Sequence, residues 1–123
     1  MEQIKNAIES FVKGGDNNDA NLLDKVLHPQ FQNIQDGFFA EKGIFTFSKS
    51  EYIELVSNKT FGGSSRTIIF ESIEQLRNIA IAKVVLESQY LKFISTIICV
   101  CVDDNWQVIN NTPKIEMKET TNG

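Results

Sequence analysis

Residues 93–102 read Phe-Ile-Ser-Thr-Ile-Ile-Cys-Val-Cys-Val, a run of ten residues with no charge and eight apolar side chains. A short apolar run of this length is typical of a buried strand. Alternation along a strand separates its side chains into two sets, one for each face of the sheet. The first set is Phe93, Ile97, Cys99 and Cys101, and the second is Ile94, Ile98, Val100 and Val102. Because both sets are apolar, we expect both faces of this strand to be covered.

This strand belongs to a predicted antiparallel meander that spans Arg66 to Thr112. Its four strands are expected at about 66–76, 78–88, 90–103 and 105–112. They are separated by short segments at Arg77-Asn78, Ser88-Gln89 and Asp103-Asp104-Asn105. Connections this short join antiparallel neighbours, because a parallel crossover needs a dozen or more residues.

Two helices are predicted before the sheet. The first covers residues 2–13, where Ile4, Ala7, Ile8, Phe11 and Val12 recur at helical spacing. We expect Gly14-Gly15 to end it, since glycine adopts the left-handed conformation without steric hindrance. The second helix is expected to start at a cap formed by Asn17 or Asn18 and to stop at His28-Pro29. Its buried side would carry Leu22, Leu23, Val26 and Leu27.

Two short strands and a third helix are expected between these helices and the meander. The strands are predicted at Gln30 to Asp36, with a turn at Asp36-Gly37, and at Gly43 to Phe47. Ser48 and Glu51 match a capping box, which predicts a helix that runs to about Lys59. Its inner face would carry Tyr52, Leu55 and Val56, and residues 61–65 would form a glycine-containing loop.

The predicted order αα, ββ, α, ββββ is that of an α+β fold. Three helices are too few to surround the sheet, so we expect all of them to pack on one concave face. The second apolar set of the 93–102 strand would then point away from the helices. We expect it to meet a second copy of the chain in a homodimer.

The composition is that of an ordinary globular domain, with 123 residues, 41% hydrophobic and 23% charged. We expect one domain over residues 1–117 and a disordered tail over 118–123. The net charge of −4 argues against a nucleic-acid-binding protein. The N-terminus lacks the apolar segment of a signal peptide, and the apolar run is shorter than the roughly 20 residues of a membrane helix. We therefore expect a cytoplasmic protein with no nucleic-acid or membrane partner.

Several local strings resemble the nuclear transport factor 2-like superfamily. They are Gly14-Gly15-Asp16, Leu22-Leu23-Asp24-Lys25, Leu27-His28-Pro29 and the segment from Asp104 to Asn110. Within that superfamily the chain is similar, over about residues 2–112, to a bacterial branch labelled putative lumazine-binding, near the SnoaL-like polyketide cyclases. The resemblance implies a strongly curved sheet that forms a cone around a helix, an internal pocket and a dimer. It does not imply one activity, because the fold carries both enzymes and binding modules.

One functional hypothesis is a small-molecule lyase, isomerase or cyclase that uses His28, the only histidine in the chain. Asp24, one helical turn earlier, could orient the imidazole, and Asp36 is a candidate inner-face carboxylate. The alternative role for His28 is a helix C-cap. Enzymes of the superfamily that move protons generally carry an Asp or Glu inside the cone, whereas the segment from Tyr90 to Val102 offers none. This difference counts against the enzyme hypothesis.

The competing hypothesis is a non-catalytic protein that holds an apolar or aromatic molecule in the cone, and the sequence favours it. Nine phenylalanines indicate an apolar pocket, although a filled core is the alternative. The expected ligand-binding residues are Phe31, Phe45, Tyr52, Tyr90, Trp106 and Asn110. Asn110 is included because a regular last strand places it on one face with Trp106 and Val108, where a buried amide needs a partner.

Neither a metal nor a cofactor is expected. Cys99 and Cys101 lie two residues apart on one strand face, too far apart for an unstrained disulfide. A zinc site would need further soft ligands, which a single distant histidine does not supply. We interpret both thiols as small buried hydrophobic groups.

Overall fold

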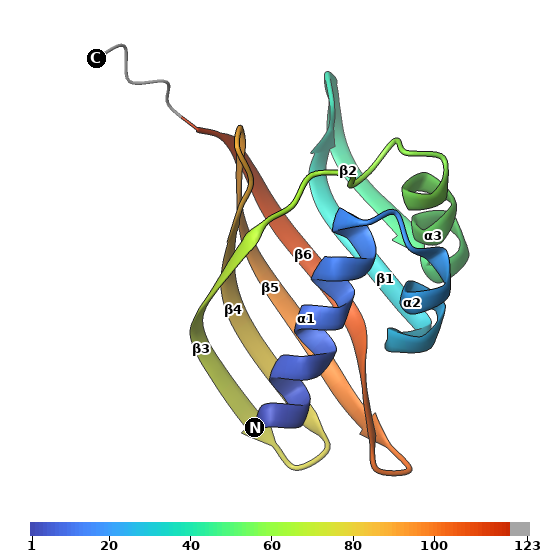
Figure 1. The fold of residues 1–123 in the computed structure, drawn as a ribbon, viewed down its shortest axis with the longest axis vertical. Helices are drawn as coiled ribbons and strands as arrows, with labels where there is room; N and C mark the ends of the chain where they lie inside the picture. The colour runs from blue at the N-terminus through green and yellow to red at the C-terminus, as the bar shows by residue number, and fades with distance from the viewer. Residues whose placement is uncertain (119–123) are drawn as a thin grey trace.

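The computed structural model describes residues 1–118, and this part of the chain contains three helices and six strands (Figure 1). The helices are α1 (Glu2–Asp16), α2 (Ala20–Val26) and α3 (Lys49–Ser57). The strands are β1 (Leu27–Phe38), β2 (Glu41–Ser48), β3 (Thr67–Leu76), β4 (Ile79–Glu87), β5 (Leu91–Val102) and β6 (Asn105–Met117). The strands form one sheet in the order β2-β1-β6-β5-β4-β3, in which only β1 and β6 pair in parallel. The predicted α+β class with a mixed sheet is confirmed.

The three helices lie on one face of the curved sheet, as predicted (Figure 1). The core lies between them and the inner sheet face, where Ile97 and Cys99 of β5 are fully buried. The second apolar set of β5 points away from the helices. In the single chain Ile94 is 37% and Val102 is 49% exposed. The outer face is therefore the uncovered apolar surface of this chain.

The meander of β3 to β6 is confirmed, including its three short connections. Arg77, Asp103 and Asp104 take positive φ at two of these turns. The last strand is longer than predicted, because Ile115 and Met117 continue the inner-face alternation opposite Phe93 and Leu91. Of the predicted tail, residues 119–123 lie outside the described part of the chain. Lys118 is described, and its amide donates to the carbonyl of Tyr90 at 2.9 Å.

The prediction that Gly14-Gly15 ends the first helix is wrong, since α1 continues through both glycines to Asp16. The reason is packing and not a left-handed turn. A Cβ at Gly14 would lie 2.6 Å from Cδ2 of Leu23, which is a fully buried side chain of α2. Gly14 therefore allows α1 and α2 to approach closely.

The predicted limits of the second helix are also wrong. Asp19, not Asn17 or Asn18, is the N-cap, and its carboxylate accepts from the amide of Leu22 at 3.1 Å. The helix ends at Val26, so that His28 and Pro29 lie in the first part of β1 and not at a helix terminus. Leu27 is buried as predicted, but as the first residue of a strand.

The first hairpin is longer than predicted, with its turn at Phe39-Ala40 and not at Asp36-Gly37. Gly37 instead takes a φ of 96° where the register between β1 and β2 shifts. The predicted capping box is confirmed: the Ser48 hydroxyl accepts from the Glu51 amide, and the Glu51 carboxylate accepts from the Ser48 amide. Tyr52 and Val56 form the buried side of α3, and Leu55 is half-buried.

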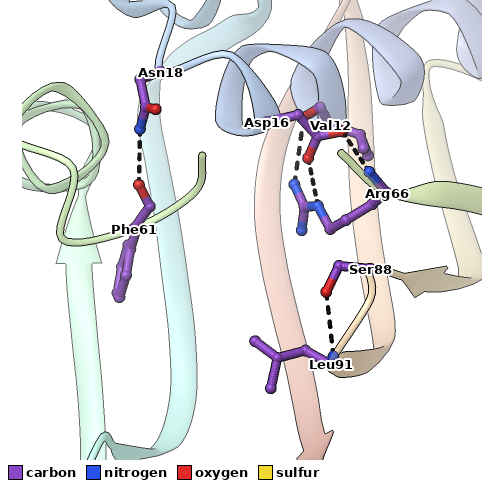
Figure 2. A network of polar contacts seen from close by, with 7 residues as sticks. All are labelled: Val12, Asp16, Asn18, Phe61, Arg66, Ser88 and Leu91. Carbon is purple, nitrogen blue, oxygen red and sulfur yellow. Dashed lines mark hydrogen bonds and ion pairs between the residues drawn. The ribbon is translucent and has the colours of Figure 1, made fainter. Parts of the chain in front are cut away.

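The loop between α3 and β3 is held against the end of α1 by polar contacts that Figure 2 shows. Asp16 accepts from Nε of Arg66 at 2.6 Å and from its amide at 3.0 Å, while Nη2 of Arg66 donates to the Val12 carbonyl. Asn18 donates to the carbonyls of Val56 and Phe61 at 2.8 and 3.0 Å. These contacts fix the position of Phe61, which belongs to the aromatic cluster described below.

None of the helices described here has the length and apolar character needed to cross a bilayer.

Replacing Gly14 by alanine is expected to destabilise the protein relative to Gly15→Ala. Both changes improve helix propensity equally, but only the first brings a Cβ within 3 Å of a core side chain; at Gly15 the Cβ would meet a single atom, Nη2 of Arg66, at 3.1 Å. Overpacking of this kind lowers the free energy of unfolding by about 1–3 kcal/mol. Urea denaturation of both variants measures the difference, and equal stabilities would contradict the close α1–α2 contact.

Removing the Asp16 carboxylate is expected to be far more harmful than removing that of Asp24. The side chains of Asp16 and Arg66 are 9% and 13% exposed, so Asp16→Ala leaves a guanidinium poorly solvated, at an expected loss of about 3–5 kcal/mol. Asp24 pairs with Lys49 but its side chain is 73% exposed, and Asp24→Ala should cost less than about 1 kcal/mol. The same denaturation assay tests this pair, and comparable losses would show that Asp16–Arg66 is not a structural contact.

Candidate functional site

Three buried carboxamides form a hydrogen-bonded chain on the inner face of the sheet. Nδ2 of Asn111 donates to Oδ1 of Asn33 at 2.7 Å, Nδ2 of Asn33 donates to Oε1 of Gln35 at 2.8 Å, and Nε2 of Gln35 donates to the carbonyl of Gly37 at 3.0 Å. The three side chains are 6%, 1% and 7% exposed, respectively. We call Asn33, Gln35 and Asn111 the amide ladder.

The amide ladder ends on an unpaired acceptor. Oδ1 of Asn111 has less than 1 Å² of accessible surface and no hydrogen-bond partner among the described residues. A buried polar atom without a partner destabilises a protein by about 1–3 kcal/mol, and such atoms are rare in native structures. The unpaired oxygen is therefore the feature of the inner face that most needs a functional explanation.

A β-bulge in β6 decides which asparagine lies inside. Cys99 pairs with Val108 and Ile98 pairs with Asn110, so that Ile109 is the extra residue and the alternation shifts by one. Asn111 consequently shares the inner face with Val108, and Asn110 shares the outer face with Ile98. The expectation that Asn110 lies inside is wrong, and its Oδ1 accepts from the Thr112 hydroxyl at 2.9 Å.

A cluster of aromatic rings lies beside the amide ladder. Asn33 is paired with Phe47 and Gln35 with Phe45 across the β1–β2 hairpin, and directly opposed residues share a face. Centroid distances of 4.9–6.4 Å connect the rings continuously. This aromatic cluster contains Phe11, Phe31, Phe38, Phe39, Phe45, Phe47, Tyr52 and Phe61. Seven of these eight aromatic residues are phenylalanines, and all eight lie in the first half of the chain.

The inner face is uncharged at the ladder. The buried polar residues of the described chain are Asn33, Gln35, Ser95 and Asn111. Tyr52 adds a hydroxyl, and burial raises its pKa to about 12, while the nearby charges of Arg66 and Asp16 act in opposite directions. The phenol is therefore protonated at neutral pH. The site thus combines aromatic walls with neutral hydrogen-bonding groups.

The structure brings together three of the six predicted ligand-binding residues. Phe31, Phe45 and Tyr52 all belong to the aromatic cluster. Tyr90 is 64% exposed in the β4–β5 turn. Trp106 packs on the core and lines a separate groove of about 380 Å³ between α1, α2 and the β5–β6 turn. A further surface hollow lies beside α3 and Pro29.

The three predicted catalytic residues do not form a constellation. Nδ1 of His28 accepts from the Gln30 amide at 3.0 Å, and the described residues show no ion pair between this imidazole and a carboxylate. Asp24 pairs with Lys49, and Asp36 is exposed. The geometry that the enzyme hypothesis requires is not seen in the described chain, and a catalytic role for His28 stays a prediction.

The two cysteines lie on the inner face of β5, and both are free thiols. Cys99 is a member of the hydrophobic core, as predicted, and burial raises its pKa to about 12. It is therefore a neutral thiol at physiological pH. Within residues 1–118 no group of three or more His, Cys, Asp or Glu side chains is arranged to hold a metal ion.

Sequence reasoning missed the amide ladder entirely. Phe31, Asn33 and Gln35 lie two residues apart on one face of β1, and this period-2 pattern of one buried aromatic and two amides could have indicated an inner face with polar groups. Asn111 carries no comparable signal, because the bulge at Ile109 cannot be placed from the sequence.

Comparisons with known proteins agree with this architecture. Residues 1–112 match the family described as "Putative lumazine-binding", and the search of curated proteins found no match. An NTF-2 like protein of unknown function from Silicibacter pomeroyi DSS-3 superposes with a TM-score of 0.80 at 12% identity, over 94% of each chain.

Two other solved structures are similar in fold. An NTF2-like protein from Cytophaga hutchinsonii ATCC 33406 has a TM-score of 0.71 at 17% identity, over 92% of this chain and 95% of that one. A nuclear transport factor 2 superfamily protein from Salmonella enterica serovar Typhimurium LT2 has a TM-score of 0.71 at 15% identity, over 98% and 94%. Identities this low show the fold alone. The family match covers most of the chain, so this chain belongs to the putative lumazine-binding family, and its fold is that of nuclear transport factor 2-like proteins.

Proposed function

We propose that this protein binds a small aromatic molecule on the inner face of its sheet, between the amide ladder and the aromatic cluster. The observation that carries the proposal is the unpaired Oδ1 of Asn111, an acceptor that a ligand N–H or O–H group would satisfy. The family description, which names a lumazine, supports a flat heteroaromatic ligand.

A ligand explains the unpaired acceptor better than an ordered water does. A buried water typically needs two to four polar partners. Here the side-chain oxygens of Asn33 and Gln35 already accept hydrogen bonds within the ladder. The neighbouring β2 side chains on this face are Phe45 and Phe47, which offer a water no polar partner. A flat molecule can contact aromatic rings and donate one hydrogen bond at the same time.

Binding requires the aromatic cluster to open, because Oδ1 of Asn111 is closed to solvent in the free chain. The outermost rings suit this role. Phe39 is 75% exposed at the β1–β2 turn, and Phe38 and Phe45 are only half-buried. Their displacement would uncover the ladder without disturbing the fully packed interface between α1 and β5.

Asn111→Leu is expected to weaken binding of lumazine, used as the probe, by about 10–100-fold, the loss associated with an unpaired buried donor. Asn110→Leu is the matched control, because the adjacent residue lies on the opposite face. Isothermal titration calorimetry measures both affinities, and circular dichroism checks that both variants fold. Equal affinities for the two variants would place the ligand elsewhere.

We also propose that two copies pair through the outer sheet face. Its apolar side chains align across neighbouring strands: Ile69, Val85 and Ile94 form one row, Ile81 and Ile98 a second, and Leu76, Ile79 and Val100 a third. Five residues of this face, Ile69, Leu76, Ile79, Ile94 and Val102, are 37–56% exposed. A two-fold axis would place the same apolar rows against each other, which makes a second copy the natural partner.

Ile98→Glu is expected to convert the dimer into a monomer, since it would place a carboxylate against the apolar rows of the second copy. Ile44→Glu is the control, because Ile44 is 68% exposed on the edge strand β2, away from the three rows. Native mass spectrometry reports the masses. A monomeric unmodified protein, or a dimeric Ile98→Glu variant, would contradict the proposed interface.

A further inference from the structure

We infer that the ligand is a neutral heteroaromatic ring with an unsubstituted ring N–H next to a carbonyl, as in a cyclic amide or imide, and that Gln35 enforces this choice. The inference deepens the proposed function and rests on it. The inference is based on the direction of the hydrogen bonds in the amide ladder. This direction is set by the Gly37 carbonyl, at the opposite end of the ladder from the unpaired oxygen.

The direction starts at the Gly37 carbonyl, which can only accept. Gln35 must therefore present Nε2 to it, and its Oε1 is turned toward Asn33. Asn33 in turn donates with Nδ2 and presents Oδ1 to Asn111. Rotating one amide by itself would oppose two N–H groups or two oxygens. The free end of the ladder is consequently an acceptor and cannot become a donor.

The Gly37 carbonyl is held by the backbone. Asp36 and Phe38 on either side of it pair with Ile44 and Glu41 of β2, and Gly37 occupies the register shift with a φ of 96°. A side chain at this φ would be strained, so glycine suits the position that begins the ladder. The polarity of the site is thus built into the β1–β2 hairpin.

Asn111 also has a donor to satisfy. Its amide nitrogen carries two hydrogens, and the described residues provide one acceptor for them, Oδ1 of Asn33. A ligand that fully satisfies this carboxamide must offer a donor and an acceptor side by side. A ring N–H beside a carbonyl does so, in the way that asparagine pairs with the edge of a base.

The ligand is expected to be uncharged in this position. The ladder residues are neutral, and the fully buried polar residues of the described chain include no charged side chain. Bringing an ion to the ladder would leave it without a counter-charge in a buried site, which is strongly unfavourable.

The test compares rings whose ring nitrogens carry hydrogen with rings whose ring nitrogens carry methyl groups. Lumazine and quinazoline-2,4-dione keep the imide N–H groups, and their 1,3-dimethyl derivatives lose them, while 6,7-dimethyllumazine keeps the N–H groups and adds methyl groups elsewhere. We expect calorimetry, at a pH where the parent rings are neutral, to show at least about tenfold tighter binding of the three N–H rings. Equal binding of the N-methylated rings would overturn the inference, and the proposed function would then stand only as binding to the aromatic cluster without a hydrogen bond to Oδ1 of Asn111. No binding by any parent ring would contradict the proposed function itself.

Gln35→Leu tests how the direction is set. Without Gln35 the Asn33 and Asn111 amides are free to reverse together. The ratio of the affinity for N–H rings to the affinity for N–CH3 rings should therefore fall toward one. A loss of packing alone would weaken all rings in parallel and preserve their ratio. An unchanged ratio in folded Gln35→Leu protein would therefore show that the Gly37 carbonyl does not set the polarity of the site. Asn110→Leu, on the outer face, should retain the full preference.

Discussion

The hydrogen bond between Nδ2 of Asn111 and Oδ1 of Asn33, 2.7 Å long, spans the only parallel strand pair of the described sheet. It joins the N-terminal hairpin, which carries most of the aromatic cluster, to the C-terminal meander, which supplies most of the core-facing strands. Because it lies in a buried environment, it is stronger than its counterpart in water, and leaving either partner unmatched would be costly. Because this bond uses Nδ2 of Asn111 as the donor, it leaves Oδ1 of Asn111 as the unpaired acceptor.

The helices position the site and contribute Phe11 and Tyr52 to its aromatic cluster. Gly14 lets α1 and α2 pack closely, Asp16 and Arg66 tie the end of α1 to the start of β3, and Asn18 holds the loop that carries Phe61 (Figure 2). These contacts are short and largely buried, whereas the rings at the β1–β2 turn are exposed. The molecule therefore has a rigid base and a looser aromatic rim, an arrangement suited to admitting a ligand.

Errors in the sequence-based reading came from residues with more than one use. Glycines after an amphipathic stretch usually end a helix, but here both lie within α1, Gly14 allows close packing on Leu23, and the left-handed φ of 49° falls on Asn18 instead. Similarly, Asn18 fits a helix cap by composition, yet its amide reaches carbonyls 38 and 43 residues away. A local pattern cannot show that a distant partner competes for the same side chain.

The sequence by itself determined the element order, the four-stranded meander, the Ser48 capping box and the helices on one face, because these follow from hydrophobic periodicity and local hydrogen bonds. Only the tertiary structure decided which amide faces inward and which atom of it stays unpaired. A single extra residue at Ile109 exchanges Asn110 for Asn111, since side chains alternate with a period of two and any insertion reverses their faces. The direction of the ladder likewise depends on a backbone carbonyl, that of Gly37 in β1, which is linked to Asn111 in β6 through the side chains of Gln35 and Asn33.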